Sequence, residues 1–220
     1  MIMRNRFDRQ LALLDENMIR MGELCELAIN RVIKALTGGS VEEARAVIEA
    51  DDEIDHMEKD IERLCLKLLL QQQPVAKDLR RISAALKMIT DMERIGDQTA
   101  DIADIVIAAN MCEVQDVRDI TIMADEAGKM VRDSVAAYVE KDLEKARQVM
   151  KSDDVVDDLF EKIRGELIAF IAEKQGKDGS EVIDLLMISK YLERIGDHAT
   201  NIAEWVEFSI TGVHKGGEKI

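Results

Sequence analysis

Proline is almost absent from this sequence, with one residue, Pro74, in a chain of 220. Aromatic residues are also scarce, at 3% of the chain, while leucine, alanine, isoleucine, glutamate and lysine are common. Proline breaks helices and aromatic residues are enriched in strands, so this composition favours long helices over a sheet. We therefore predict an all-α protein that is long enough to bury a substantial core.

The sequence also lacks a basic excess, closely spaced cysteines and long apolar runs. Its net charge of -15 argues against nucleic acid as a partner, because such binding depends on neutralising phosphates with Lys and Arg. Three scattered cysteines with no CxxC pair, Cys25, Cys65 and Cys112, are typical of a reducing compartment. The apolar stretch 64–70 is interrupted by Lys67 and is far shorter than a membrane span. With no recognisable signal peptide, we expect a cytoplasmic protein.

What the sequence does contain is an internal duplication. The segment Glu-Arg-Ile-Gly-Asp occupies 93–97 and returns at 193–197. A second block, in which Ala-Arg precedes a group of aspartates, begins at Ala44 and again at Ala146. Two blocks that recur in the same order at nearly the same offset indicate two copies of one small domain. We predict domains over residues 1–112 and 113–220.

Each copy is predicted to be a three-helix bundle. Apolar residues recur at spacings of three and four, Ser40 and Glu43 form a capping box, and Pro74 suits the first turn of a helix. The expected helices span 8–36, 40–72, 75–110, 117–140, 143–174 and 181–210, with a linker at 110–116. Short connections make neighbouring helices antiparallel. The predicted architecture is two tandem homologous bundles, six long helices in all, related by a pseudo-twofold axis.

The repeated motif places a carboxylate on a helix face that is otherwise apolar. Glu93 lies in a seam of apolar or small residues, and Glu193 lies at the matching position of the second copy. A carboxylate at the edge of a packed face is costly unless it is paired or bound to a metal. Gly96 and Gly196 each lower helix propensity by about 1 kcal/mol relative to alanine. A glycine there permits the close approach of another backbone or of a ligand.

The predicted hairpins bring further carboxylates opposite the motif. Folding the chain about residues 73 and 177 sets an aspartate pair of the preceding helix against each motif, and residues four apart share one side of a helix. The predicted ligands of two metal sites are Asp51, Asp55, Glu93, Asp97, Asp153, Asp157, Glu193 and Asp197. Oxygen-only ligands suit divalent or iron-type ions, such as Fe, Mn, Mg or Ca, rather than structural zinc.

A solvated acidic surface is the alternative interpretation, with Arg94 and Arg194 as ion-pair partners of the carboxylates. His198 has Gln98 as its counterpart in the first copy, so it is not expected to be a required ligand. Four further polar residues continue the same face and are expected to be solvated or, less favourably, auxiliary ligands: Asp101, Asp104, Asn201 and Glu204.

The motifs resemble those of the PhoU family. The segments that carry the resemblance are Gln-Pro-Val-Ala-Lys-Asp-Leu-Arg at 73–80, Asp-Met-Glu-Arg-Ile-Gly-Asp at 91–97 and Leu-Glu-Arg-Ile-Gly-Asp-His at 192–198. The resemblance implies two three-helix bundles with acidic motifs that hold metal. It also implies negative regulation of phosphate uptake and of the phosphate-starvation response, through the Pst transporter's ATPase subunit and a PhoR-type sensor kinase, with a homodimer expected. The second copy has Lys-Asp-Gly-Ser at 177–180 where the first has its Pro-x-Ala-x-Asp-Leu-Arg segment.

The sequence shows no nucleophile with an adjacent base and no phosphate-cradling glycine loop, so we predict a regulatory protein and not an enzyme. The rival hypothesis is a carboxylate-bridged di-iron enzyme, whose bundles carry two Glu-x-x-His motifs. This chain has one, at Glu53 and His56, and the second copy has Asp158 in place of the histidine. A helical scaffold without a regulatory role is a third alternative.

Overall fold

The structure is a computed structural model that describes residues 2–72, 74–109, 117–173 and 179–213. It confirms the all-α prediction. The six helices of these residues are α1 (Ile2–Gly38), α2 (Val41–Gln72), α3 (Ala76–Ala108), α4 (Arg118–Glu140), α5 (Leu143–Glu173) and α6 (Gly179–Thr211).

The predicted helix boundaries hold to within two residues, except at the start of α1. That helix begins at Ile2 and not near Asp8, and Phe7 in its early turns is 8% exposed. The predicted linker at 110–116 and most of the predicted turn at 175–180 lie outside the described residues, as does the domain boundary between 112 and 113.

Local hydrogen bonds explain where several helices begin and end. The Ser40 hydroxyl accepts a bond from the Glu43 amide at 3.2 Å, which confirms the predicted cap of α2. At the matching place in the second copy, a carboxylate oxygen of Asp142 accepts from the Lys145 amide at 3.0 Å. Helix α4 ends at Glu140 and is followed by Lys141, whose φ is 58°, and the Asp142 amide donates to the Ala137 carbonyl at 3.0 Å. This is the left-handed helix ending that glycine normally occupies.

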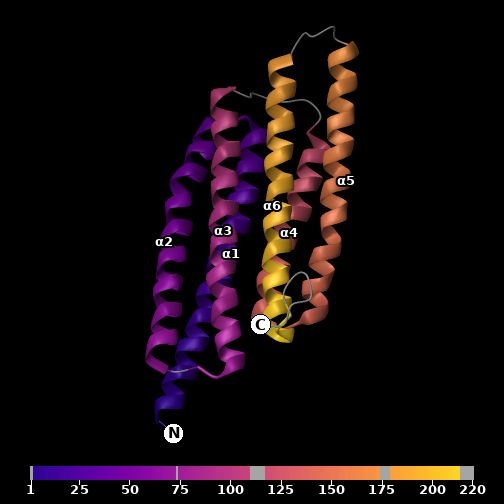
Figure 1. Ribbon diagram of the computed structural model, residues 1–220. Coiled ribbons are helices and arrows are strands. Elements are labelled where there is room, and N and C mark those ends of the chain that lie inside the picture. Colours follow the sequence, from indigo (N-terminus) through magenta and orange to yellow (C-terminus); the bar gives the residue numbers. More distant parts are fainter. Residues whose placement is uncertain (1, 73, 110–116, 174–178, 214–220) are drawn as a thin grey trace.

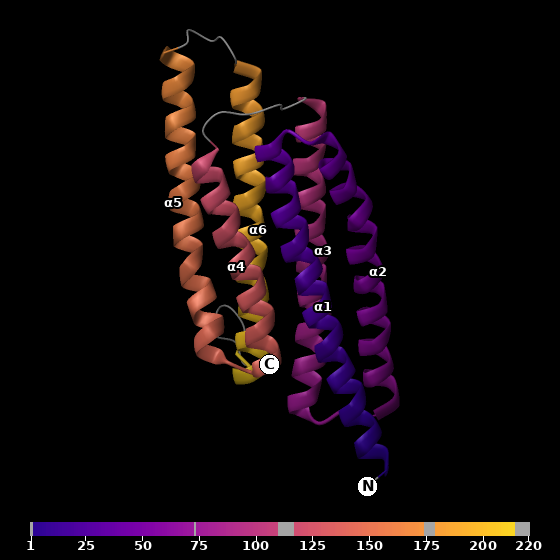
Figure 2. The same cartoon turned by 180° about the vertical axis from the view of Figure 1, so that it is seen from behind.

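The six helices form two layers (Figure 1). Helices α2, α3, α6 and α5 lie side by side in one layer, and α1 and α4 lie behind them, as the reverse view shows (Figure 2). Each three-helix copy is packed within itself, and α3 against α6 and α1 against α4 join the two copies.

One hydrophobic core runs through both copies. The predicted seams of α3 and α6 lie inside it, with Met92 and Ile95 of the first copy and Leu192 and Ile195 of the second fully buried. Since buried residues of both copies belong to one cluster, the halves are expected to unfold together.

The two copies differ in the length of their first helix. Helix α1 has 37 residues and α4 has 23. The Lys162 ammonium group lies 2.7 Å from a carboxylate oxygen of Asp119, so α4 begins level with residue 162 of α5. The ends of α5 and α6 beyond this level, residues 163–173 and 179–188, project past α4 in both views and are called the α5–α6 overhang.

Replacing Leu14, a fully buried residue of α1, with alanine should test the continuity of the core. We expect a loss of about 3 kcal/mol in unfolding free energy, because the cavity is only partly refilled. Trp205, the one tryptophan of the chain, lies in α6 of the second copy. The urea concentration at the midpoint of its fluorescence change should fall, although the substitution lies in the first copy. Leu13→Ala, at a neighbour that is 45% exposed, is the control and should leave the midpoint in place. An unchanged tryptophan midpoint in Leu14→Ala would show that the halves unfold separately.

Candidate functional site

The first acidic cluster lies where α2 packs tightly against Gly96 of α3. The Oδ1 atom of Asp51 occupies the space into which a Cβ atom on Gly96 would project. The Cδ1 atom of Ile54 would lie 3.1 Å from the same point. A side chain larger than hydrogen would displace both, so the glycine permits the close approach that the sequence predicted.

Asp51 is the most strongly perturbed carboxylate of this cluster. Its Oδ1 atom is buried and has no hydrogen-bond partner. Burial, followed by the charges of Asp97, Asp55 and Glu93, raises the pKa of Asp51 to about 6. The four predicted carboxylates of the first copy are therefore close enough in space to repel one another.

Basic side chains neutralise much of the remaining charge. A guanidinium nitrogen of Arg94 donates to an Asp97 carboxylate oxygen at 2.8 Å, and its Nε lies 3.4 Å from a Glu93 oxygen. The Lys59 ammonium group lies 3.3 Å from Asp55. Asp51 is the member of the cluster without such a cation among its contacts in the described structure.

The second cluster repeats this arrangement between α5 and α6, with looser packing. The Oδ1 atom of Asp153 lies 3.5 Å from the position of a Cβ on Gly196. Burial and the charges of Asp157 and Asp197 raise the pKa of Asp153. Burial and the charge of Glu193 likewise raise the pKa values of Asp157 and Asp197.

Here the neutralising cation is a lysine. Lys190 forms an ion pair with Glu193 and lies over the ring of Phe160, with 5.0 Å between its Nζ and the ring centroid. Its charge opposes the rise in the pKa values of Asp157 and Asp197.

The donor chemistry of both clusters suits a hard cation, because every predicted ligand is a carboxylate. The buried oxygen of Asp51 without a bonding partner fits the same purpose. The side chains do not converge on a common point, however. In the part of the chain that the structure describes, no three Asp, Glu, His or Cys side chains form a group able to hold a metal as they stand. To coordinate an ion, Glu93 and Asp97 would have to turn away from Arg94.

Residues that continue the acidic face have a different role from the one predicted. Asp91 of α3 accepts hydrogen bonds from His198 at 2.9 Å and from Asn201 at 3.3 Å, both on α6. Asp101 of α3 lies beside the hydroxyl of Tyr191 on α6. Asp101 and Asn201, which were expected to be solvated, are half-buried and join the two copies; Asp104 is exposed as expected.

The sequence held a signal for this polar contact. Positions 91 and 191, and 101 and 201, are equivalent in the duplication and are polar in both copies. Polar residues at equivalent positions on two helices that pack together are candidates for cross-pairing.

The Glu-x-x-His pair of α2 has other partners. Glu53 forms an ion pair of 2.8 Å with Arg20 of α1. The Nδ1 atom of His56 bonds to the Asp52 carbonyl of its own helix, and both side chains are exposed. Neither side chain points into a bundle core as a di-iron ligand would.

Replacing Asp51 with asparagine should stabilise metal-free protein at pH 7.5. Because folding raises the pKa of Asp51, the stability linked to its protonation is present below pH 4 and is lost as the pH rises through about 6. The gain in unfolding free energy should be about 1 kcal/mol after solvent screening, and smaller at pH 4.5. Urea denaturation with chelator at both pH values measures it. Asp52→Asn, at an exposed neighbour, is the control, and an equal gain from both variants would rule out the cluster as the cause.

In the described residues, no helix is both long and apolar enough to cross a membrane.

Comparison with known proteins places the chain in a family. The model of the PhoU domain matches it twice, over residues 18–106 and 120–206. A protein of Clostridium acetobutylicum named phosphate-specific transport system accessory protein PhoU homolog is 39% identical over 211 residues, covering 95% of this chain and 96% of its own. Its namesake from Zymomonas mobilis is 38% identical and covers 94% of this chain and 87% of its own.

Solved structures agree with these sequence matches. The crystal structure of PhoU from Pseudomonas aeruginosa superposes with a TM-score of 0.87 at 32% identity, covering 94% of this chain and all of that one. The crystal structure of the phosphate transport system regulatory protein PhoU from Streptococcus pneumoniae superposes with a TM-score of 0.84 at 25% identity. The match covers 97% of this chain and 99% of that one. With two matched domains and the same fold along nearly its full length, the chain belongs to the PhoU family.

Proposed function

We propose that this protein is a cytoplasmic accessory regulator of phosphate transport that restrains phosphate uptake and the phosphate-starvation response by protein contact. The observation that carries the proposal is the 39% identity, over 95% of the chain, to an accessory protein of a phosphate-specific transport system. The proposed partners are the transporter's ATPase subunit and a sensor kinase of the PhoR type. A homodimer stays a prediction that analytical ultracentrifugation would test.

The physical properties of the chain support action by contact. Six long helices around one core give a stiff body, and the net charge of -15 surrounds it with a negative field. Such a field steers basic partner surfaces toward the protein and accelerates their association, most strongly at low salt. Membrane association in this proposal is indirect and comes from the partners.

We propose further that each acidic cluster binds a divalent or iron-type cation. Asp51, Asp55, Glu93 and Asp97 would hold it in the first copy, and Asp153, Asp157, Glu193 and Asp197 in the second. Support comes from the oxygen-only donor set, from the burial and mutual repulsion that raise the pKa of Asp51, and from its buried oxygen without a partner. A bound cation would remove that repulsion and release Arg94 from Glu93 and Asp97 toward solvent or a partner carboxylate.

Metal content tests this part of the proposal. Protein purified without chelator should carry metal at both clusters, and Glu93→Ala with Asp97→Ala should lose about half of it, because one of two sites is removed. Mass spectrometry of the metal, normalised to protein, gives the stoichiometry. Glu53→Ala with Asp52→Ala removes the same charge from an exposed part of α2 and is the control. An unchanged metal content in the first variant would favour the solvated acidic surface.

Deletion tests the regulatory role. In a host whose genome encodes one such protein, its loss should leave phosphate-starvation genes active in phosphate-rich medium, and the wild-type gene should restore repression. A reporter fused to a starvation promoter measures the effect. The proposal fails if repression persists after deletion and neither a transporter subunit nor a kinase co-purifies with the protein.

A di-iron enzyme would behave differently. Iron-loaded protein of that class should consume oxygen with turnover, whereas a regulator should not. The contacts of Glu53 with Arg20 and of His56 with its own helix favour the regulator.

A further inference from the structure

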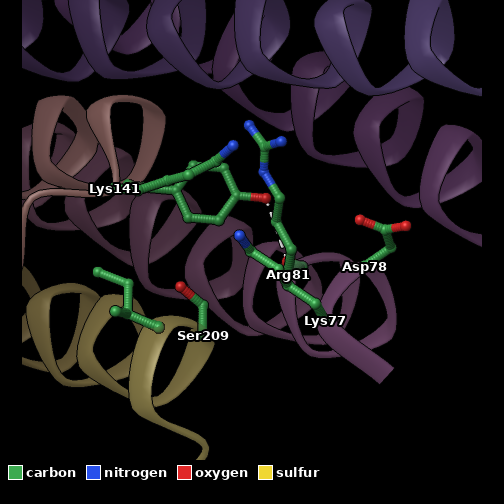
Figure 3. A pocket seen from close by; sticks show the side chains of 7 residues that line it. Lys77, Asp78, Arg81, Lys141 and Ser209 are labelled. Carbon is green, nitrogen blue, oxygen red and sulfur yellow. Dashed lines mark hydrogen bonds between the residues drawn. The ribbon is translucent and has the colours of Figure 1, made fainter. Parts of the chain in front are cut away.

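A basic cavity lies at the end of the molecule where α3 begins and where α4 and α6 finish (Figure 3). Its volume is about 260 Å³. Both copies contribute to the lining, which consists of Lys77, Asp78, Arg81, Tyr138, Lys141, Ser209 and Ile210. Arg81 and Glu93 are twelve residues apart on α3, which corresponds to about 18 Å along a helix, so the cavity is distinct from the carboxylate clusters.

The charge of the cavity is opposite to that of the protein. Lys77, Arg81 and Lys141 gather around it in a chain whose net charge is -15. Figure 3 shows the end of Lys141 near the guanidinium group of Arg81 and the end of Lys77 between Arg81 and Ser209, while the carboxylate of Asp78 points the other way. Asp15 of α1, the other acidic group in contact, forms an ion pair with Arg81. The local excess is thus positive.

Arg81 is held rigidly in place. Its side chain is 12% exposed and its guanidinium group lies 5.5 Å from the ring centroid of Tyr138. The Tyr138 hydroxyl in turn donates to the backbone carbonyl of Arg81 at 3.1 Å. The guanidinium group therefore gives the cavity a fixed positive charge of a kind that recognises oxyanions.

Lys141 occupies a position that does not favour lysine. Its φ of 58° lies in the left-handed region, where a Cβ atom clashes with the backbone and glycine is normally found. The chain has lysine there, and that lysine lines the cavity. A lysine at a strained position next to a basic cavity points to a use for its charge.

We propose that this cavity binds a small phosphate-type oxyanion, either inorganic phosphate or a small phosphomonoester. The ammonium groups of Lys77 and Lys141 and the guanidinium group of Arg81 supply positive charge and donors suited to phosphate oxygens. The volume of about 260 Å³ is below the range of about 300–1,000 Å³ for drug-sized ligands, which favours a small ion over a nucleotide. The inference goes beyond the proposed function, since binding requires neither transporter nor kinase.

A structural role for the lysines is the rival explanation. Cationic side chains near a helix C-terminus stabilise its last carbonyl groups, and α4 and α6 both end at this cavity. In that case the lysines would matter for stability, and no anion would bind.

Calorimetric titration of the full chain distinguishes the two explanations. The protein is first freed of metal with chelator, so that phosphate cannot bind through an ion in the carboxylate clusters. Inorganic phosphate and glycerol 3-phosphate are then titrated in parallel. We expect one site per chain, and tighter binding of one ligand identifies free phosphate or a monoester as the better fit.

Lys141→Gly is the decisive variant, because glycine suits the backbone there. We expect its affinity for phosphate to fall about tenfold or more while its thermal midpoint is unchanged or higher. Lys77→Gln should weaken binding similarly, and Lys87→Gln, an exposed lysine ten residues further along α3, should bind as the wild type does. The proposal is overturned if neither ligand binds the wild type at millimolar concentration, or if Lys141→Gly binds as tightly as the wild type.

Discussion

The close approach of α2 to α3 at Gly96 is the constraint on which the acidic face depends. It holds the Asp51 carboxylate between two helices, where water cannot fully solvate it and where three other carboxylates lie near. An ordinary surface would let these side chains spread into solvent. Here the backbone geometry keeps them together, and Arg94 compensates in part. The second copy keeps the glycine but relaxes the contact, and it relies on Lys190 instead.

The acidic clusters and the basic cavity lie in different parts of the molecule. Acidic groups line the two outer seams of the four-helix layer, α2 with α3 and α5 with α6, whereas basic groups gather at one end, where the copies meet. Between these regions, Asp91 with His198 and Asn201 provides a polar contact across the junction of the copies. Buried polar contacts of this kind fix the register of two helices more specifically than apolar packing does.

Much of the fold and of the carboxylate clusters could be predicted from the sequence, because the duplication shows each motif twice. The Glu-Arg-Ile-Gly-Asp motif, the capping box at Ser40 and the break at Pro74 are local features, and local features set the helices and the hairpins. The lateral packing of α3 on α6 could not be predicted, since periodicity shows which face is apolar but not which helix covers it. For that reason Asn201 and Asp101 were expected in solvent. The basic cavity was missed for the same reason, because Arg81 is far in sequence from Tyr138 and Lys141 and meets them only when the two copies pack together.

The unequal first helices give the two copies different rigidity. In the first copy α1 extends along the whole α2–α3 hairpin, and Phe7 and Leu11 are nearly buried. In the α5–α6 overhang, residues 164–173 of α5 include no buried side chain, and Ile168 is 60% exposed, whereas Val182, Leu185 and Ile188 of α6 stay buried. A helix end with so few buried contacts opens locally without unfolding the rest. Amide hydrogens at this end of α5 should therefore exchange with solvent much faster than those of α2 and α3, so the two copies differ in local stability at their ends.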